Sequence, residues 1–459
     1  SSGSRGRGNL SSTANPYFLF PQIYNFRYNI YSSEWPVANR VIELYLQKKS
    51  ENGGWERQIN GISNNEKAVL LLEKRTFKEL LVDMELRNLQ NNIVGQEASR
   101  LFARAEINMG VEAFRDSLYS LLKRNTFLNI KFENMLDTLG EISRTDIRSL
   151  LGEWEKTTPL PFYSLGEPTL TKITNKGGEE FFVLKMLISN NSDYDGIIHM
   201  DIRKDGWWYQ PLEDPRAKTK IEMPAHTSKE FVSVWEDQIR NVEINTMVSG
   251  NLPNIISQDI NNVKQERNKI VKDSIYILPE SSFDLPGEII VDNEDSTLFI
   301  LSAPPIVGLL PKWLDEVEET PFKYSGISWW RPPLQWTATT NDRYYGKYIR
   351  SAFVIKSGDG SQTATWKVPV PEVGQYDLYY HVFKDDELRW NNNLQGEYHF
   401  KVKYGSEVED AYVNLRKANE GWEQLGSYYF DSDTVRVVLT DECKLRSVTA
   451  DAVKIVKRY

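Results

Sequence analysis

Two short stretches of the sequence combine tryptophan with polar side chains. The first, residues 327–336, carries Trp329, Trp330 and Trp336 around a pair of prolines. Because proline keeps the backbone extended and cannot join a sheet ladder, we expect some of these indoles near the surface. The second, residues 389–395, places Trp390 directly before three asparagines in an expected loop. Flat aromatic faces stack on sugar rings and amides hydrogen-bond hydroxyl groups, so both stretches predict carbohydrate binding.

Nine residues are the candidate carbohydrate-binding positions: Trp329, Trp330, Trp336, Tyr344, Tyr345, Trp390, Asn391, Asn392 and Asn393. The alternative for each indole is that it fills the interior of a β-sandwich or covers its edge, since tryptophan is usually well buried. Trp366 and Trp422 lie in framework-like phrases of the sequence, and we expect both in a core rather than at a ligand.

Residues 292–295 bring three carboxylates and one amide together as Asp-Asn-Glu-Asp. Calcium prefers such oxygen ligands, so Asp292 and Asp295 are a calcium candidate. The alternative is a solvated turn that follows a strand. We expect no other cofactor and no other metal site.

The residue patterns that usually mark catalysis are absent from the sequence. None of the four histidines, His199, His226, His381 and His399, lies four residues from another, so the His-Glu-x-x-His zinc motif is missing. Cys443 follows two acidic residues, whose charges raise the pKa of a thiol and disfavour a reactive thiolate. There is also no Gly-x-Ser-x-Gly elbow and no glycine-rich phosphate loop. We expect no catalytic residue in this chain, although the sequence does not decide whether the protein is an enzyme.

Length and charge restrict the class of protein. A chain of 459 residues predicts about three packed units. A net charge of −9 gives no basic footprint for phosphates, so we expect no nucleic-acid partner. No run approaches the roughly 18 apolar residues that a membrane-spanning helix needs. Residues 1–30 are polar and predict a flexible tail without the apolar segment of a signal peptide, as in a mature, truncated or never exported chain.

The periodicity of apolar residues divides the remaining chain into four segments. Residues 31–160 repeat apolar side chains at helical spacing and predict an α-helical domain of about six helices. Residues 161–250 form short strand-like runs between turns and predict a small antiparallel β-sandwich. Residues 251–285 are polar and predict a connector with one short helix. Residues 286–459 predict a second, aromatic β-sandwich of jelly-roll or lectin-like type, so the expected fold class is multidomain α + β.

Six short phrases follow one another in the last segment. They are Gly-Glu-Ile-Ile-Val-Asp-Asn-Glu-Asp at 287–295, Tyr-Tyr-Gly at 344–346, Ala-Thr-Trp at 364–366, Pro-Glu-Val-Gly-Gln-Tyr at 371–376, Gly-Trp-Glu-Gln-Leu-Gly at 421–426 and Ala-Asp-Ala-Val-Lys-Ile at 450–455. In this order they resemble the golvesin or xanthan-lyase type of carbohydrate-binding-like domain. That family occurs at the ends of bacterial secreted enzymes, so the resemblance implies a glycan-binding sandwich outside the cytoplasm. The tryptophan-rich insertion before residue 337 departs from the family pattern.

The phrase Leu-Gly-Glu-Trp-Glu-Lys-Thr-Thr-Pro-Leu-Pro at 151–161 ends a helical region just before a β-region. This order resembles the part that follows the active site in gluzincin zinc aminopeptidases. In that family the helix that residues 34–46 resemble supplies a glutamate as the third zinc ligand, and here Arg40 stands at that position. A guanidinium cannot bind zinc, so the resemblance implies a degenerate, inactive peptidase-like body.

The sequence therefore predicts a non-catalytic, extracytoplasmic region of a bacterial protein, secreted, periplasmic or on the cell surface, that binds polysaccharide or cell-surface glycan. Two alternatives stay open. The chain could be the C-terminal part of a zinc aminopeptidase-like enzyme whose catalytic segment lies outside it. It could also be a structural subunit that docks protein partners of a surface complex. The glycan, the oligomeric state and the choice between a binder and a spacer are not determined by the sequence.

Overall fold

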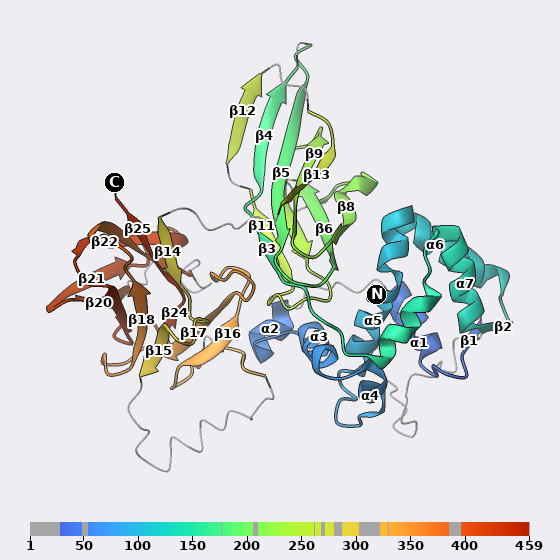
Figure 1. Cartoon of the computed structure of the whole chain (residues 1–459), viewed down its shortest axis with the longest axis horizontal. Coiled ribbons are helices and arrows are strands. Elements are labelled where there is room, and N and C mark those ends of the chain that lie inside the picture. The colour runs from blue at the N-terminus through green and yellow to red at the C-terminus, as the bar shows by residue number, and fades with distance from the viewer. Residues whose placement is uncertain are drawn as a thin grey trace, which may run out of the picture.

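The computed structural model describes residues 28–47, 54–175, 177–204, 210–260, 262–267, 271–279, 287–302, 322–328, 330–384 and 396–458. Figure 1 shows three regions: helices in blue and cyan, a tall β-region in green and yellow, and a C-terminal β-region in orange and red. This arrangement confirms the predicted multidomain α + β class, with a helical N-terminal region followed by two β-regions. None of the described helices is both long and apolar enough to cross a membrane.

The helical region surrounds a core that is rich in aromatic rings. Its elements are β1 (Asn29–Tyr31), α1 (Ala38–Leu46), α2 (Gly54–Asn60), α3 (Asn64–Lys74), α4 (Phe77–Val82), α5 (Gln90–Met109), α6 (Val111–Arg124), β2 (Asn129–Lys131), α7 (Phe132–Ser143) and the 3-10 helix η1 (Arg148–Glu155). Ser63 and Thr76 begin α3 and α4 with capping boxes, which satisfy free backbone N–H groups. The buried indole of Trp154 packs against Trp35 and Phe77, with ring centroids 5.0 and 4.9 Å apart.

The middle region is a β-sandwich of two sheets. Its elements are β3 (Tyr163–Leu165), β4 (Thr169–Thr174), β5 (Glu180–Asn190), β6 (Gly196–Lys204), β7 (Gln210–Pro211), η2 (Pro215–Ala217), β8 (Lys218–Met223), β9 (Thr227–Trp235), β10 (Ile239–Asn245), β11 (Ile255–Asp259), β12 (Val263–Arg267) and β13 (Ser274–Pro279). One sheet has the order β12-β4-β5-β9-β13, with β3 on β5, and the other has the order β11-β10-β6-β7, with β8 on β6. Alternate apolar residues of β5 and β6, such as Met186 and Met200, meet in the shared core.

The segment 251–285 differs from the connector with one short helix that the sequence predicts. Its described part holds the three strands β11, β12 and β13 and no helix. β12 and β13 lie at the two edges of one sheet, paired with β4 and β9. The polar side chains of an edge strand such as β12 resemble those of a loop in sequence, because an edge strand buries little of its surface. The middle sandwich therefore extends to Pro279.

The C-terminal region is a larger sandwich. Its elements are β14 (Glu288–Val291), β15 (Phe299–Ser302), β16 (Thr337–Thr340), β17 (Ser351–Lys356), β18 (Thr363–Pro369), β19 (Gly374–Val382), β20 (Glu397–Tyr404), β21 (Glu407–Asn414), β22 (Gly421–Phe430), β23 (Thr434–Thr440), β24 (Ser447–Ala450) and β25 (Val453–Lys457). They form sheets of order β14-β25-β19-β22, β15-β18-β23-β20-β21 and β16-β17-β24. Trp366 is fully buried in the core that these sheets share, as the sequence predicts.

The three regions meet around a short buried segment before β11. Leu252 pairs with the C-terminal sandwich through two backbone hydrogen bonds, one to the oxygen of Tyr348 at 3.1 Å and one from the nitrogen of Arg350 at 2.6 Å. The backbone nitrogen of Asn254 donates to the carboxylate of Glu66 in α3 at 3.0 Å. The backbone at Gly326 also packs closely against α2, because a Cβ on Gly326 would lie 1.9 Å from the backbone oxygen of Ile59. Together these contacts hold the loops of both sandwiches beside the helices.

Candidate functional site

The outer face of the sheet β14-β25-β19-β22 carries aromatic and charged side chains. Every second residue of β19 is buried, which turns Tyr379 and His381 toward the outer face. Trp422 of β22 lies opposite His381, and Lys454 of β25 lies opposite Tyr379. The pairing of three strands therefore places residues from distant parts of the sequence next to one another.

We call five partly exposed residues the outer-face cluster: Tyr345, Tyr379, His381, Trp422 and Lys454. The ring centroid of Trp422 lies 5.1 Å from that of Tyr345 and 5.2 Å from that of His381. The ammonium nitrogen of Lys454 lies 4.9 Å from the Trp422 centroid and 5.4 Å from the Tyr379 centroid, within the range of cation–π attraction. The same nitrogen donates to Glu288 at 3.0 Å. The cluster thus combines ring faces with a charged donor and a carboxylate acceptor.

A buried carboxylate positions one end of the outer-face cluster. The Oδ2 atom of Asp451 lies 2.8 Å from Nδ1 of His381, and both carboxylate oxygens accept from the backbone nitrogen of Tyr345 at 3.2 Å. Burial raises the pKa of Asp451, while His381 and the Tyr345 N–H lower it. The side chain of Asp451 has no exposed surface. It therefore acts as an internal anchor for His381 and Tyr345.

Tyr345 enters the cluster from a tight loop that requires glycine. A Cβ on Gly346 would lie only 1.9 Å from the backbone oxygen of Ile349, so any other residue would push the loop open. The same loop is tied back by the Tyr344 nitrogen, which donates to the Asn341 oxygen at 3.2 Å. The Tyr-Tyr-Gly sequence at 344–346 therefore fixes the position of the Tyr345 ring.

The predicted carbohydrate-binding residues lie in several separate places. Trp330 is 68% exposed, with the Arg446 guanidinium 5.6 Å from its ring centroid. Trp336 is partly buried and packs against the C-terminal core. Tyr344 is buried, with its ring 4.6 Å from Phe383, so its faces are covered. Tyr345 belongs to the outer-face cluster. The remaining candidates lie outside the described residues: Trp329, Trp390, Asn391, Asn392 and Asn393.

Four members of the outer-face cluster were not among the sequence candidates. Trp422 is expected in the core, yet it is partly exposed on the outer face. Alternation along residues 374–382 was the available signal for Tyr379 and His381, since it predicts that they point away from Tyr380. Which outward residues become neighbours depends on strand register, which the alternation within one strand does not determine.

The calcium candidates Asp292 and Asp295 form a turn after β14. The Oδ2 atom of Asp295 accepts from the Asp292 nitrogen at 2.8 Å, and Oδ1 of Asp292 accepts from the Asn293 nitrogen at 2.7 Å. Burial, followed by the charge of nearby Asp451, raises the pKa of Asp292 well above its usual range. Within the described residues no group of three or more His, Cys, Asp or Glu residues could hold a metal ion. Calcium binding at this turn stays a prediction.

The potentially reactive residues have structural surroundings. His226 and His399 each contact a carboxylate, Asp193 at 2.8 Å and Asp410 at 2.7 Å. Burial lowers the pKa of His199 to about 4, so its imidazole is neutral at pH 7. Burial also raises the pKa of Cys443, which keeps the thiol protonated. These groups do not form a nucleophile and base pair in the described structure.

Arg40, the residue at the position of the third zinc ligand in the gluzincin resemblance, forms an ion pair within α1. Its Nη1 atom lies 3.0 Å from Glu43, and its Nε atom donates to Asn91 of α5 at 3.1 Å. These contacts join two helices of the helical region. The resemblance to zinc aminopeptidases remains a prediction.

Residues 332–457 match the family described as Golvesin C-terminal domain. No curated protein matches the chain. Among solved structures, the chain is similar to TmCBM61 in complex with beta-1,4-galactotriose, with 14% sequence identity, a TM-score of 0.16, and coverage of 26% of this chain and 77% of that chain. It is also similar to a Bacteroides uniformis beta-glucuronidase, with 10% identity and a TM-score of 0.18, covering 65% of this chain and 30% of that one. These TM-scores are too low to transfer a function.

Proposed function

From the premise that residues 332–457 form a golvesin C-terminal domain, we propose that this protein binds carbohydrate through the outer-face cluster. The observation that carries the proposal is that Lys454, paired with Glu288, lies over the rings of Trp422 and Tyr379 on one sheet face, with Tyr345 beside Trp422. Carbohydrate recognition needs this combination, because a sugar has a weakly polar ring face and a rim of hydroxyl groups.

The surroundings of the cluster favour a polar ligand over an apolar one. Gln424 and Ser427, both exposed, continue the outer face along β22, and the Gln424 amide donates to Asp377 of β19 at 3.1 Å. Arg458 donates to the other oxygen of Asp377 at 2.8 Å. A glycan that lies along the strands would therefore meet aromatic faces at one end and amide, hydroxyl and charged groups at the other.

We place this activity in a non-catalytic body. The helical region contacts the segment before β11 through Glu66, and that segment contacts the C-terminal sandwich through Leu252. The helical region also carries the resemblance to a degenerate peptidase. The location we propose is extracytoplasmic, on the surface of a bacterium or in its surroundings. It rests on the likeness of the C-terminal phrases to modules at the ends of bacterial secreted enzymes. The partner is a polysaccharide or a cell-surface glycan.

A second candidate function is the docking of a protein partner, and the edge strand β13 favours it. Four consecutive residues of β13 are exposed and apolar or aromatic: Ile275, Tyr276, Ile277 and Leu278. The strand pairs with β9 on one side and ends the sheet in the described part of the chain. An apolar strand at the edge of a sheet is a site at which another strand can add. Self-association or capture of a partner that is lost in Ile277→Lys would support this function.

The test of glycan binding is a glycan array and a polysaccharide affinity gel with the full chain. We expect Trp422→Ala and Tyr379→Ala each to weaken binding about tenfold or more. The matched control is Tyr412→Ala, because Tyr412 is also 59% exposed but belongs to β21, a strand of the other sheet. Binding lost only in Trp330→Ala would move the site to Trp330 and remove the outer-face cluster from the proposal. Failure of the folded chain to bind any glycan would overturn the function.

A further inference from the structure

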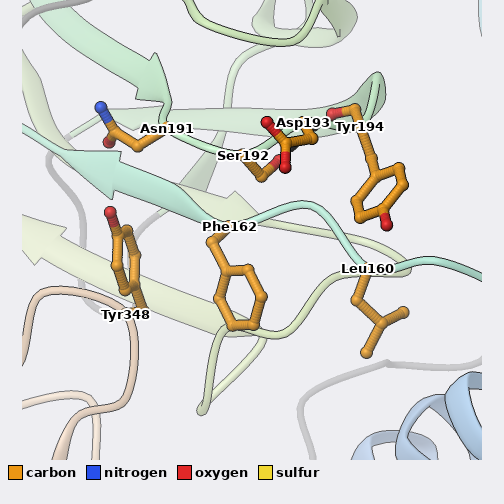
Figure 2. Close-up of a pocket in the computed structure, with 7 residues that line it drawn as sticks. All are labelled: Leu160, Phe162, Asn191, Ser192, Asp193, Tyr194 and Tyr348. Atoms are coloured by element: carbon orange, nitrogen blue, oxygen red, sulfur yellow. Dashed lines mark hydrogen bonds between the residues drawn. The ribbon is translucent and has the colours of Figure 1, made fainter.

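An open hollow of about 380 Å³ lies where the middle sandwich meets the C-terminal sandwich. Figure 2 shows the rings of Phe162 and Tyr348 side by side, beneath the loop of residues 191–194. Their ring centroids are 5.4 Å apart with planes inclined at 59°. Leu160 and Tyr194 extend the apolar surface on the other side. The volume lies at the lower end of the range of small-molecule sites.

The hollow is held in shape by backbone contacts on both sides. The nitrogen of Asn191 donates to the Phe162 oxygen at 3.1 Å, and the nitrogen of Leu252 donates to the Tyr348 oxygen at 3.1 Å. Gly250 makes room for the aromatic floor, because a Cβ there would lie 2.2 Å from the ring of Phe162. The two rings are therefore preorganised, which lowers the entropic cost of binding.

The polar rim of the hollow holds one carboxylate, that of Asp193, beside the Asn191 amide and the hydroxyl groups of Ser192, Tyr194 and Tyr348. The carboxylate of Asp193 is 83% exposed and lies 2.8 Å from Nε2 of His226. Ser192 uses its hydroxyl to donate to Asn190 at 2.6 Å, and Asn191 accepts from Ser164 at 2.8 Å. A ligand that binds the Asp193 carboxylate donates hydrogen bonds to its oxygens. Sugar hydroxyls do so, whereas a proline-rich peptide, which also fits aromatic floors, has few N–H donors.

We propose that this hollow is a second carbohydrate subsite, in which a sugar ring packs on Phe162 and Tyr348 and its hydroxyls donate to the Asp193 side. The ligand class rests on the proposed function, but the residues are different. The same loop serves both sites, since Tyr345 belongs to the outer-face cluster and Tyr348 to the hollow. Three residues of extended chain span at most about 11 Å, so the two rings come from neighbouring points of the backbone.

Two neighbouring subsites predict a dependence on glycan length. An oligosaccharide that reaches both sites gains from the second contact without a second loss of translational freedom, so it binds more tightly than a monosaccharide. The site also depends on the junction between the two sandwiches, because the middle sandwich supplies Phe162 and Asp193 and the C-terminal sandwich supplies Tyr348. The C-terminal module alone would lack this subsite.

The experiment is calorimetric titration of the full chain with soluble cello-, xylo-, manno- and galacto-oligosaccharides of one to six residues. We expect Tyr348→Ala to weaken the longer members about tenfold and to leave monosaccharides nearly unchanged. Tyr348→Phe keeps the ring and is expected to bind as the wild type does. Asp193→Asn, on an exposed side chain, is expected to weaken binding about threefold and serves as a variant that does not threaten the fold.

The outcomes separate this proposal from the outer-face site. Two subsites are supported if Tyr348→Ala further weakens oligosaccharide binding in a chain that already carries Trp422→Ala. Complete loss in Trp422→Ala with no effect of Tyr348→Ala or Asp193→Asn overturns the second subsite and leaves the proposed function intact. Loss of binding in Tyr348→Ala but not in Trp422→Ala supports the hollow as the binding site and overturns binding at the outer-face cluster. Binding of a polyproline decapeptide in place of every sugar, or no binding of any sugar, overturns the subsite.

Discussion

The Nδ1 atom of His381 lies 2.8 Å from Oδ2 of Asp451, a carboxylate without exposed surface. The two residues are 70 positions apart and belong to β19 and the turn between β24 and β25. The same carboxylate accepts the Tyr345 N–H at 3.2 Å. One buried acid therefore connects the core of the C-terminal sandwich with two rings of the outer-face cluster.

Removal of this acid is expected to damage stability and binding together. Asp451→Ala leaves the His381 side chain and the Tyr345 N–H without this acceptor, and we expect a local loss of about 1–3 kcal/mol. Hydrogen exchange at the amides of β19 and β25 measures this local free energy in a chain of several domains. Asp451→Asn retains one acceptor oxygen and is expected to lose less. Equal protection in wild type and Asp451→Ala would contradict the anchoring role.

The carboxyl of Asp292 predicts a specific pH dependence. Burial and the charge of Asp451 raise its folded-state pKa above the unfolded value of about 3.9. The folded state binds the proton more tightly, so this contribution to stability is fully present below the unfolded pKa and is lost as pH rises through the folded pKa. Asparagine does not ionise, so Asp292→Asn avoids this loss of stability at higher pH. We expect its melting temperature to exceed that of the wild type more at pH 7 than at pH 4.

Asp359→Asn is the matched control for this pH experiment. Hydrogen bonds from Ser361 lower the pKa of the exposed Asp359, which is the opposite direction. Its contribution is present above the unfolded pKa and is lost as pH falls through the folded pKa, so the variant should not gain stability at pH 7. A difference between Asp292→Asn and wild type that stays constant from pH 4 to pH 8 would count against the assignment for Asp292.

Calcium gives a separate test at the turn after β14. A cation between Asp292 and Asp295 would relieve the repulsion between Asp292 and Asp451, so binding predicts a rise in the melting temperature of the wild type with added CaCl2. A ligand at 100 times its dissociation constant stabilises by about 2.7 kcal/mol. Asp292→Asn is expected to show a smaller rise or none. The same rise in wild type and variant, or no rise in either, would exclude this turn as a calcium site.

The junction between the helices and the middle sandwich predicts a large effect at Glu66. Its carboxylate accepts from Arg57 at 3.0 Å, from the Ser63 nitrogen at 2.6 Å and from the Asn254 nitrogen at 3.0 Å. Glu66→Ala leaves a buried guanidinium and two N–H groups without an acceptor, so we expect a loss of about 3–5 kcal/mol, seen in thermal unfolding and exchange of α3. Glu79→Ala removes the equivalent glutamate from the exposed capping box of α4, and we expect a loss of stability of about 1 kcal/mol or less.

The two classes of element differ in how far the sequence predicted them. The helical region was predictable because its apolar residues recur at helical spacing and Ser63 and Thr76 mark helix starts. Strands β11, β12 and β13 were missed, because the side chains of an edge strand such as β12 face solvent and resemble a loop in sequence, and the apolar run of β13 directly follows that polar stretch. The core position of Trp366 was predicted, whereas Trp422, in a similar phrase, turned out to be partly exposed.

The sequence by itself determined the fold class, the aromatic C-terminal sandwich and the absence of a zinc motif, because these depend on local periodicity and on residue types. Tertiary structure decided which side chains meet. Strand register placed Tyr379, His381, Trp422 and Lys454 together, and the packing of two sandwiches around Leu252 brought Phe162 beside Tyr348. These contacts join residues far apart in the chain, and their formation depends on burial and hydrogen bonding summed over the whole fold, which no local pattern contains.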